Sequence, residues 1–291
     1  MILKLISKPT IGEHSLTFKL IMEYQKYSGA GNKFIIFDNL DDGITNRSET
    51  VLGLFENGNN DEIDGVIFVE KSTLGDFWMN YYNRDGTGNS LCGNGLRCTV
   101  QFLLDNSLTD KHDLIIESIG KTFPCKVNDD GKITVTFPPP EIIRAGIKLK
   151  TALSDWSEDL PCSYINVGTP HIVIFIEDLG LDSLEDVKVN EWGRSIRMHK
   201  DLMPEGANVN FIKVTGDNEI AMRTYERGVE RETLACGTGA LSSAITVFAV
   251  KNIIPPINIL VRSGEHLTVG FDYDSNEIGA LTLTGGAVRI S

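Results

Sequence analysis

The sequence contains one short element twice. Cys92-Gly93-Asn94-Gly95 and Cys236-Gly237-Thr238-Gly239 each place a cysteine before glycine, a polar residue, a second glycine and an apolar run. The two copies lie 144 positions apart in a chain of 291 residues. The glycines let the backbone turn tightly and approach a ligand closely. The run that follows predicts a helix, whose first N–H groups have no partner within the helix.

Two further landmarks recur at similar spacing. The glycine turn and β-rich run from Gly31 to Phe37 returns 137 residues later in the run from Val167 to Phe175. The turn that begins at Asn83 returns 143 residues later in the turn that begins at Glu226. Three matched landmarks at nearly equal spacing indicate an internal duplication.

The apolar pattern between these landmarks predicts a mixed α/β chain. We expect a helix after each cysteine, and the second is apolar nearly all round, which predicts that it is buried on every side. We expect a further short helix over 50–55 and strands over 65–70, 77–82, 114–117, 133–137 and 221–226.

The run Pro138-Pro139-Pro140 cannot lie inside a sheet, so we place a domain boundary there. The expected domains are residues 22–137 and residues 138–279. The last segment, 280–291, lies outside the repeat and is expected to return to the first domain. Residues 1–21 carry no motif, and their role stays open between a tail, an added edge strand and an upstream start.

Composition and spacing exclude several classes of protein. A net charge of −13 argues against a nucleic-acid partner, and no apolar run is long enough to span a membrane. Five cysteines without a signal peptide predict a cytoplasmic protein without disulfides, and the absence of a CxxC pair or a histidine cluster predicts no metal site. Gly29 and Gly31 begin a glycine pattern of the dinucleotide-binding kind, but Phe34 occupies the position of its third glycine, which argues against a dinucleotide-binding site.

The duplicated thiols suggest a chemistry. Duplicated domains commonly face each other with a site between them, which would place Cys92 and Cys236 on either side of one bound carboxylate. A base on one face of a carbon and an acid on the other invert its configuration, and a thiol can serve in either role. If only one of these two cysteines were present, it would be interpreted as a small buried residue. Cys98, Cys125 and Cys162 are interpreted as such structural residues, because they are not followed by the Gly-polar-Gly motif.

These motifs, with the turn at Asn32 and the run Tyr225-Glu226-Arg227-Gly228, resemble the diaminopimelate epimerase family from residue 22 onward. The resemblance implies two pseudo-symmetric domains, each a sheet curled around a central helix. It also implies an isomerase without a cofactor, and without pyridoxal phosphate in particular, that interconverts LL- and meso-2,6-diaminopimelate. A small-molecule substrate is thus the expected partner, and a homodimer is left open.

The resemblance also assigns roles to residues. Cys92 and Cys236 would be the acid/base pair, and the amides of Gly93, Asn94, Gly237 and Thr238 would hold the reacting carboxylate. The remaining substrate-binding residues would be Asn32 and Glu226 for the reacting amino group, Asn83, Asn208 and Arg227 for the distal end, and His171 near the thiols. From propensity alone, Asn32 and Asn83 would be turn residues, Arg227 a surface charge and His171 a core residue.

The sequence departs from the family pattern at several positions. Thr169 replaces an asparagine that binds substrate in the family. The segment 60–65, which ends in Gly65, replaces a glycine-rich segment. Lys33 replaces the family's usual acidic residue, and Gly286 replaces a common proline. Thr169 and Gly65 are therefore uncertain site residues. Two alternatives stay open: a racemase of another amino acid, such as histidine or glutamate, and a non-catalytic binding protein of the same fold.

Overall fold

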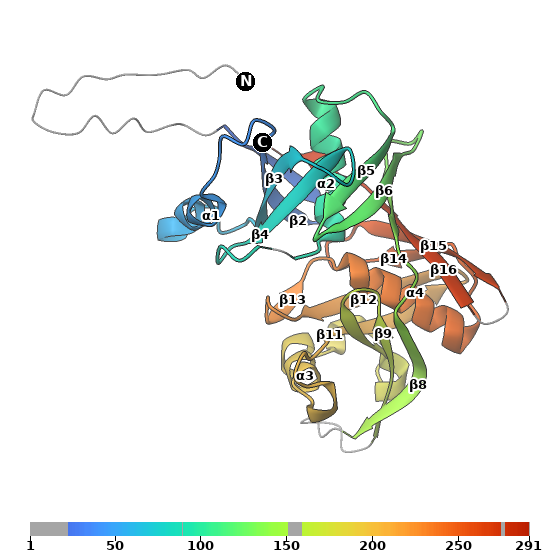
Figure 1. Cartoon of the computed structure of the whole chain (residues 1–291). Helices are drawn as coiled ribbons and strands as arrows, with labels where there is room; N and C mark the ends of the chain where they lie inside the picture. The colour runs from blue at the N-terminus through green and yellow to red at the C-terminus, as the bar shows by residue number, and fades with distance from the viewer. Residues whose placement is uncertain (1–22, 89, 151–158, 275–276, 291) are drawn as a thin grey trace, which may run out of the picture.

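The chain folds into two lobes joined by a continuous β-sheet (Figure 1). The computed structural model describes residues 23–88, 90–150, 159–274 and 277–290, so the extension over 1–21 lies outside the described residues. The helices are α1 (Arg47–Phe55), α2 (Gly93–Asp105), α3 (Val189–Arg197) and α4 (Gly237–Lys251), and the 3-10 turns are η1 (Glu56–Gly58), η2 (Ile176–Leu179), η3 (Leu184–Asp186) and η4 (Lys200–Leu202).

The first eight strands are β1 (Gln25–Gly29), β2 (Asn32–Asp38), β3 (Gly65–Lys71), β4 (Phe77–Asn83), β5 (Asp113–Ser118), β6 (Lys121–Val127), β7 (Ile133–Phe137) and β8 (Ile142–Lys150). The others are β9 (Asp159–Asn166), β10 (Pro170–Phe175), β11 (Asn208–Gly216), β12 (Glu219–Glu226), β13 (Arg231–Thr233), β14 (Ile257–Leu260), β15 (His266–Asp274), β16 (Glu277–Gly285) and β17 (Val288–Arg289). Every helix and strand expected from the sequence is present.

The strand pairings repeat between the lobes. In the N-terminal lobe the strands neighbour one another in the order β17-β1-β2-β3-β4-β5-β6-β7. In the C-terminal lobe the order is β8-β9-β10-β11-β12-β14-β15-β16, with β13 added beside β12. Each parallel pair in one lobe, β2 with β3 and β4 with β5, corresponds to a parallel pair in the other, β10 with β11 and β12 with β14. The sheet therefore preserves the internal duplication.

The two repeats exchange strands. The equivalent strands β7 and β16 pair with each other, and the hydroxyl groups of Thr134 and Thr284 lie 2.7 Å apart at this junction. Beyond the junction, β8 continues from the N-terminal repeat and pairs with β9, whereas β17 continues from the C-terminal repeat and pairs with β1. The proline run lies between β7 and β8, where the chain passes from one lobe to the other.

Each lobe curls around one helix. Helix α2 packs against strands of the N-terminal lobe and α4 against strands of the C-terminal lobe, which confirms the expected α/β class with a central helix in each half. Strand residues alternate between two faces: Phe34 and Ile36 face the core around the central helices, whereas Ile35 and Phe37 face a smaller cluster under α1. Helix α3 covers the corresponding outer face of the C-terminal lobe.

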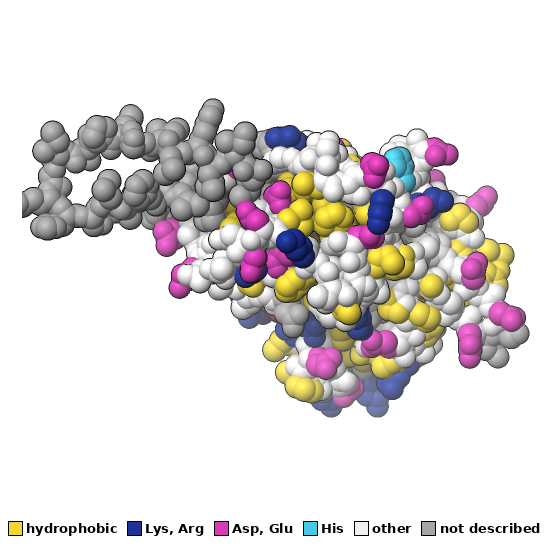
Figure 2. All heavy atoms as spheres, turned by 45° about the horizontal axis from the view of Figure 1, so that its top comes forward, with side chains coloured by type: hydrophobic (Ala, Val, Ile, Leu, Met, Phe, Trp, Pro, Cys, Tyr) yellow, Lys and Arg dark blue, Asp and Glu magenta, His cyan; other side chains and the backbone are white. Residues whose placement is uncertain are grey.

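Helix α4 is buried from Gly237 to Val247, as its all-round apolar sequence predicts. Its last turn departs from that expectation, because Ala249 and Val250 are exposed where the helix leaves the sheet. Within the described residues, no helix is long and apolar enough to span a membrane. Figure 2 shows acidic, basic and hydrophobic side chains intermixed on one face of the molecule.

Candidate active site

The two cysteine-bearing helix starts meet at the interface between the lobes. Cys92 and Cys236 are the N-cap residues of α2 and α4, with nearly identical extended backbones (φ −132°, ψ 105° and φ −130°, ψ 112°). The first backbone bonds of the two helices are donated by Leu96 and Ala240. The amides that precede them have no partner within the helices and can bind an anion.

A cavity of about 710 Å³ lies at this interface. Of the sequence-predicted site residues, the cavity brings together Asn32, Asn83, Cys92, Gly93, Asn94, Thr169, Asn208, Glu226, Arg227, Cys236, Gly237 and Thr238. His171 and Gly65 do not line it. His171 is fully buried behind Thr238, with 3.0 Å between His171 Nε2 and Thr238 Oγ1. Gly65 lies under Tyr81, whose ring would collide with any added Cβ.

On the N-terminal side, a chain of hydrogen bonds orients the amide side chains. Arg97 donates to the Asn94 Oδ1 atom over 2.8 Å, Asn94 donates to the Asn32 Oδ1 atom over 2.5 Å, and Asn32 donates to the Asp64 carboxylate over 3.1 Å. The Arg97 guanidinium is fully buried, and its Nη1 atom has no hydrogen-bond partner within the described part of the chain. A buried cation therefore lies at one end of this chain and a cavity-lining carboxylate at the other.

On the C-terminal side, Glu226 contributes a second carboxylate. Burial raises the pKa of Glu226 to about 7, and the Thr233 hydroxyl, which donates to it over 2.5 Å, opposes that rise. Asn208 accepts a hydrogen bond from the Arg227 backbone amide over 2.7 Å. The Arg227 guanidinium donates to the Glu205 carbonyl group. Asp64 and Glu226 give the cavity two acidic groups that suit an ammonium ligand.

Both thiols have raised pKa values in this cavity. Burial raises the pKa of Cys92 to about 12, the Gly95 amide at 3.3 Å opposes this, and the charges of Glu226 and Asp64 add to it. Burial and the neighbouring Glu226 charge raise the pKa of Cys236 well above its ordinary value. A cationic group bound beside the two carboxylates would cancel their effect and favour a thiolate.

Further polar residues line the cavity, among them Asn83 and Thr169. Asn83 Nδ2 donates to Thr87 Oγ1 over 3.1 Å and lies 3.4 Å from Ser90 Oγ, which agrees with its interpretation as a turn residue as well as a lining residue. Thr169 lines the opposite wall, in the turn before β10. Its carbonyl group accepts a hydrogen bond from the Val167 amide.

Sequence reasoning missed three residues of this region. Asp64 and Tyr81 line the cavity, and Asn210 is fully buried in contact with His171. Asn210 had a detectable signal, because Asn208 and Asn210 place two amides at alternate positions of an otherwise apolar strand. Asp64 was noted only as part of an atypical segment, and its approach to Asn32 depends on the pairing of β2 with β3.

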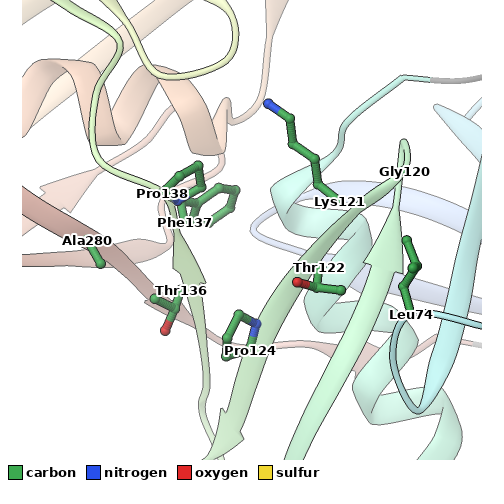
Figure 3. A pocket seen from close by; sticks show the side chains of 9 residues that line it. All are labelled: Leu74, Gly120, Lys121, Thr122, Pro124, Thr136, Phe137, Pro138 and Ala280. Carbon is green, nitrogen blue, oxygen red and sulfur yellow. The ribbon is translucent and has the colours of Figure 1, made fainter.

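A second hollow, of about 650 Å³, lies on the surface over β6 and β7 (Figure 3). Among the residues that line it, Lys121 is the one charged side chain, and no thiol or carboxylate is present. It therefore lacks the thiols and carboxylates that line the first cavity. Within the described ranges, no cluster of three or more histidine, cysteine or acidic residues is arranged to hold a metal ion.

The fold is shared with solved structures of low sequence identity. A phenazine biosynthesis protein of the PhzF family from Bacillus anthracis superposes with a TM-score of 0.70 at 16% identity, over 93% of this chain and 97% of that one. A hydroxyproline epimerase from Agrobacterium vitis also superposes with a TM-score of 0.70 at 16% identity, over 93% of this chain and 91% of that one. These similarities confirm the two-lobed fold.

Sequence comparison identifies the family. The diaminopimelate epimerase family model matches residues 24–143 and 163–289. The diaminopimelate epimerase of Hydrogenobaculum sp. (strain Y04AAS1) is 35% identical over 86% of this chain and 91% of its own, and that of Aquifex aeolicus is 34% identical over 92% and 96%. With two matched repeats and relatives of this similarity over nearly the whole chain, the protein belongs to the diaminopimelate epimerase family of isomerases.

Proposed function

We propose that this protein interconverts LL- and meso-2,6-diaminopimelate by two-base proton transfer between Cys92 and Cys236, without a cofactor. The observation that carries the proposal is the position of the two thiols at facing helix N-termini on one cavity. The similarity to named diaminopimelate epimerases supports the substrate. Such a reaction would supply lysine and peptidoglycan synthesis.

The reacting carboxylate would bind between the helix starts. The amides of Gly93, Asn94, Gly237 and Thr238 belong to the first turns of α2 and α4, whose N–H groups have no acceptor within the helices. Negative charge grows on the carboxylate as the α-carbon loses its proton. Two helix N-termini stabilise that charge more in the transition state than in the bound substrate, which lowers the barrier.

The reacting ammonium group would bind beside Asn32, Asp64 and Glu226. Its positive charge offsets the carboxylates that raise the thiol pKa values, so substrate binding itself promotes formation of the thiolate. By analogy with the family, the Cys92 thiolate takes the α-proton from the L-configured centre, and the Cys236 thiol donates a proton to the opposite face. The reverse reaction exchanges the two roles.

The distal amino-acid end would lie against Asn83, Asn208 and Arg227, which also line the cavity. Thr169 replaces the amide expected there and offers a single hydroxyl group. This replacement favours a second candidate, an isomerase of another amino acid with the same thiol pair. All five cysteines are free, which suits a reducing compartment such as the cytoplasm; a homodimer stays a prediction.

The decisive experiment is α-proton exchange in deuterated water. The wild-type protein is expected to incorporate deuterium into LL-diaminopimelate while forming the meso isomer, and Cys92→Ala and Cys236→Ala should each abolish epimerisation. Cys162→Ala, which removes a thiol far from the cavity, is the matched control and should retain activity. Full turnover by either active-site variant would refute the mechanism. Exchange with glutamate, histidine or proline in preference to diaminopimelate would support the second candidate, and no exchange with any of them would indicate a binding protein.

A further inference from the structure

A chain of buried polar side chains lies behind Cys236. Thr224 of β12 donates from Oγ1 to the Asn210 Oδ1 atom over 2.9 Å, and Asn210 Nδ2 lies 3.0 Å from His171 Nδ1. On the other side of the imidazole ring, Nε2 lies 3.0 Å from Thr238 Oγ1, which is 3.5 Å from Cys236 Sγ. All five side chains are buried, and buried polar groups generally have hydrogen-bond partners within the protein.

The position of Asn210 decides the direction of these bonds. Its amide nitrogen also lies 3.2 Å from the Ile172 carbonyl oxygen, which can only accept, so this end of the amide must be the donor. Asn210 therefore donates to His171 Nδ1, and the single proton of the neutral imidazole lies on Nε2. That N–H donates to Thr238 Oγ1, and the hydroxyl proton of Thr238 is left to point at Cys236 Sγ.

One other group approaches the same ring nitrogen. Asn208 Nδ2 lies 3.4 Å from His171 Nε2, but two N–H groups cannot bond to each other, and the Asn208 Oδ1 atom already accepts from the Arg227 amide. The Asn208 amide nitrogen consequently keeps its hydrogens for the cavity that it lines. Burial, with the Arg227 charge, lowers the pKa of His171 to about 3, so the ring is neutral near pH 7.

The equivalent positions beside Cys92 carry no such chain. The strands β2, β3 and β4 of the N-terminal lobe correspond to β10, β11 and β12 of the C-terminal lobe. With their pairing registers aligned, Phe34 is equivalent to His171, Ile67 to Asn210 and Tyr81 to Thr224. Phe34 and Tyr81 pack edge to face, and the Ile67 side chain faces Gly95 where the Asn210 side chain faces Gly239. The duplicated thiols thus have different surroundings: these positions beside Cys92 carry Phe34, Ile67 and Tyr81, whereas those beside Cys236 carry a chain of polar side chains that ends at the Thr238 hydroxyl group.

We propose that Asn210 is a positioning residue that holds His171 in its Nε2–H tautomer and thereby directs the Thr238 hydroxyl proton toward the sulfur of Cys236. A donor aimed at the sulfur stabilises the thiolate more than the thiol. The inference rests on the proposed function, in which Cys236 alternates between these forms. The ionisable groups around Cys236 are Glu226 of β12, Cys92 at the start of α2 and the neutral His171 of β10.

Two measurements test this proposal without turnover. In protein labelled with ¹⁵N-histidine, the ring nitrogens of His171 should report the Nε2–H tautomer, with no titration between about pH 5 and pH 9. Assignment uses a His171→Gln sample. In the second measurement, alkylation by iodoacetamide is followed at each cysteine by peptide mapping as a function of pH. In Thr238→Val, the pH midpoint for Cys236 should rise by about one unit, and that for Cys92 should not move.

Thr246→Val is the matched control, because Thr246 is a fully buried hydroxyl of the same helix that donates to the Ser242 carbonyl group instead. In Asn210→Leu, the Nδ1–H tautomer of His171 should be populated and the pH midpoint of Cys236 alkylation should rise. If this variant does not fold, the wild-type NMR spectrum and the alkylation of Thr238→Val still test the proposal. An Nδ1–H tautomer in the wild-type protein, or equal Cys236 midpoints in Thr238→Val and Thr246→Val, would overturn the proposal. Neither result depends on epimerisation, whose loss in Cys236→Ala tests the proposed function separately.

Discussion

Gly237 at the start of α4 packs directly against Gly93 at the start of α2, and a Cβ built on Gly237 would lie 3.7 Å from the Gly93 Cα atom. The same Cβ would lie 3.0 Å from Leu283 Cδ2, which is tighter than ordinary van der Waals contact. Because Gly237 has no side chain, Leu283 of β16 can pack directly behind the start of α4. A side chain at this position would have to displace either Leu283 or the start of the helix.

Replacing Gly237 with alanine should displace Leu283 or shift the start of α4, which carries Cys236. We expect kcat to fall about tenfold or more, since displacements below 1 Å misalign reacting groups, and stability to fall by about 1–3 kcal/mol from overpacking. Steady-state kinetics and thermal unfolding measure the two effects. Gly53→Ala, at an exposed position of α1 with nothing within 4 Å, is the control and should be slightly stabilising. Unchanged kcat in Gly237→Ala would show that this contact does not set the geometry.

Replacing Glu226 with glutamine should stabilise the protein at high pH only. Burial raises the pKa of Glu226 from 4.5 to about 7, so its ionisation disfavours the folded state. That cost is absent below about pH 4.5 and complete above about pH 7. Glu226→Gln should therefore be more stable than the wild type at pH 8, by roughly 3 kcal/mol and with a higher unfolding temperature, and show almost no change at pH 4. Equal effects at both pH values would contradict the buried charge, and activity should fall at either pH.

Asp64→Asn should separate substrate binding from thiol ionisation. After burial, the charges of Glu226 and Asp64 are what raise the pKa of Cys92, so removing one charge should move the alkylation midpoint of Cys92 to lower pH. The KM should rise about tenfold, because an ammonium ligand loses a charged acceptor. Glu62→Gln is the control, since this fully exposed acid of the same segment pairs with Lys26. An unchanged KM in Asp64→Asn would remove Asp64 from the ammonium site.

Thr169→Asn tests substrate selectivity. The longer amide restores a donor and an acceptor at the distal end of the cavity, so kcat/KM for diaminopimelate should rise about three- to tenfold if the distal group binds there. Rates with other amino acids should not rise in parallel. A fall in kcat/KM for diaminopimelate would indicate that the distal end lies elsewhere or that the preferred substrate is different.

The sequence by itself determined the features that depend on local spacing. The two Cys-Gly-polar-Gly frames define two helix starts, and the apolar periodicity of the following runs defines which faces are buried. Glu226 and Arg227 were expected in the site because the run Tyr225-Glu226-Arg227-Gly228 resembles the family motif. Each of these motifs is formed by residues close together in the sequence, so it can be recognised without knowledge of the tertiary structure.

Only the tertiary structure decided which distant residues meet. The register of β1 with β17 and that of β7 with β16 join residues more than a hundred positions apart, and propensity carries no information about such pairings. Asp64 reaches Asn32, and Asn210 reaches His171, only because parallel strands place them side by side. The duplicated sequence predicts two equivalent thiols. The packing of Ile67 behind the start of α2 and of Asn210 behind the start of α4 makes their surroundings different, because those surroundings are set by neighbouring strands.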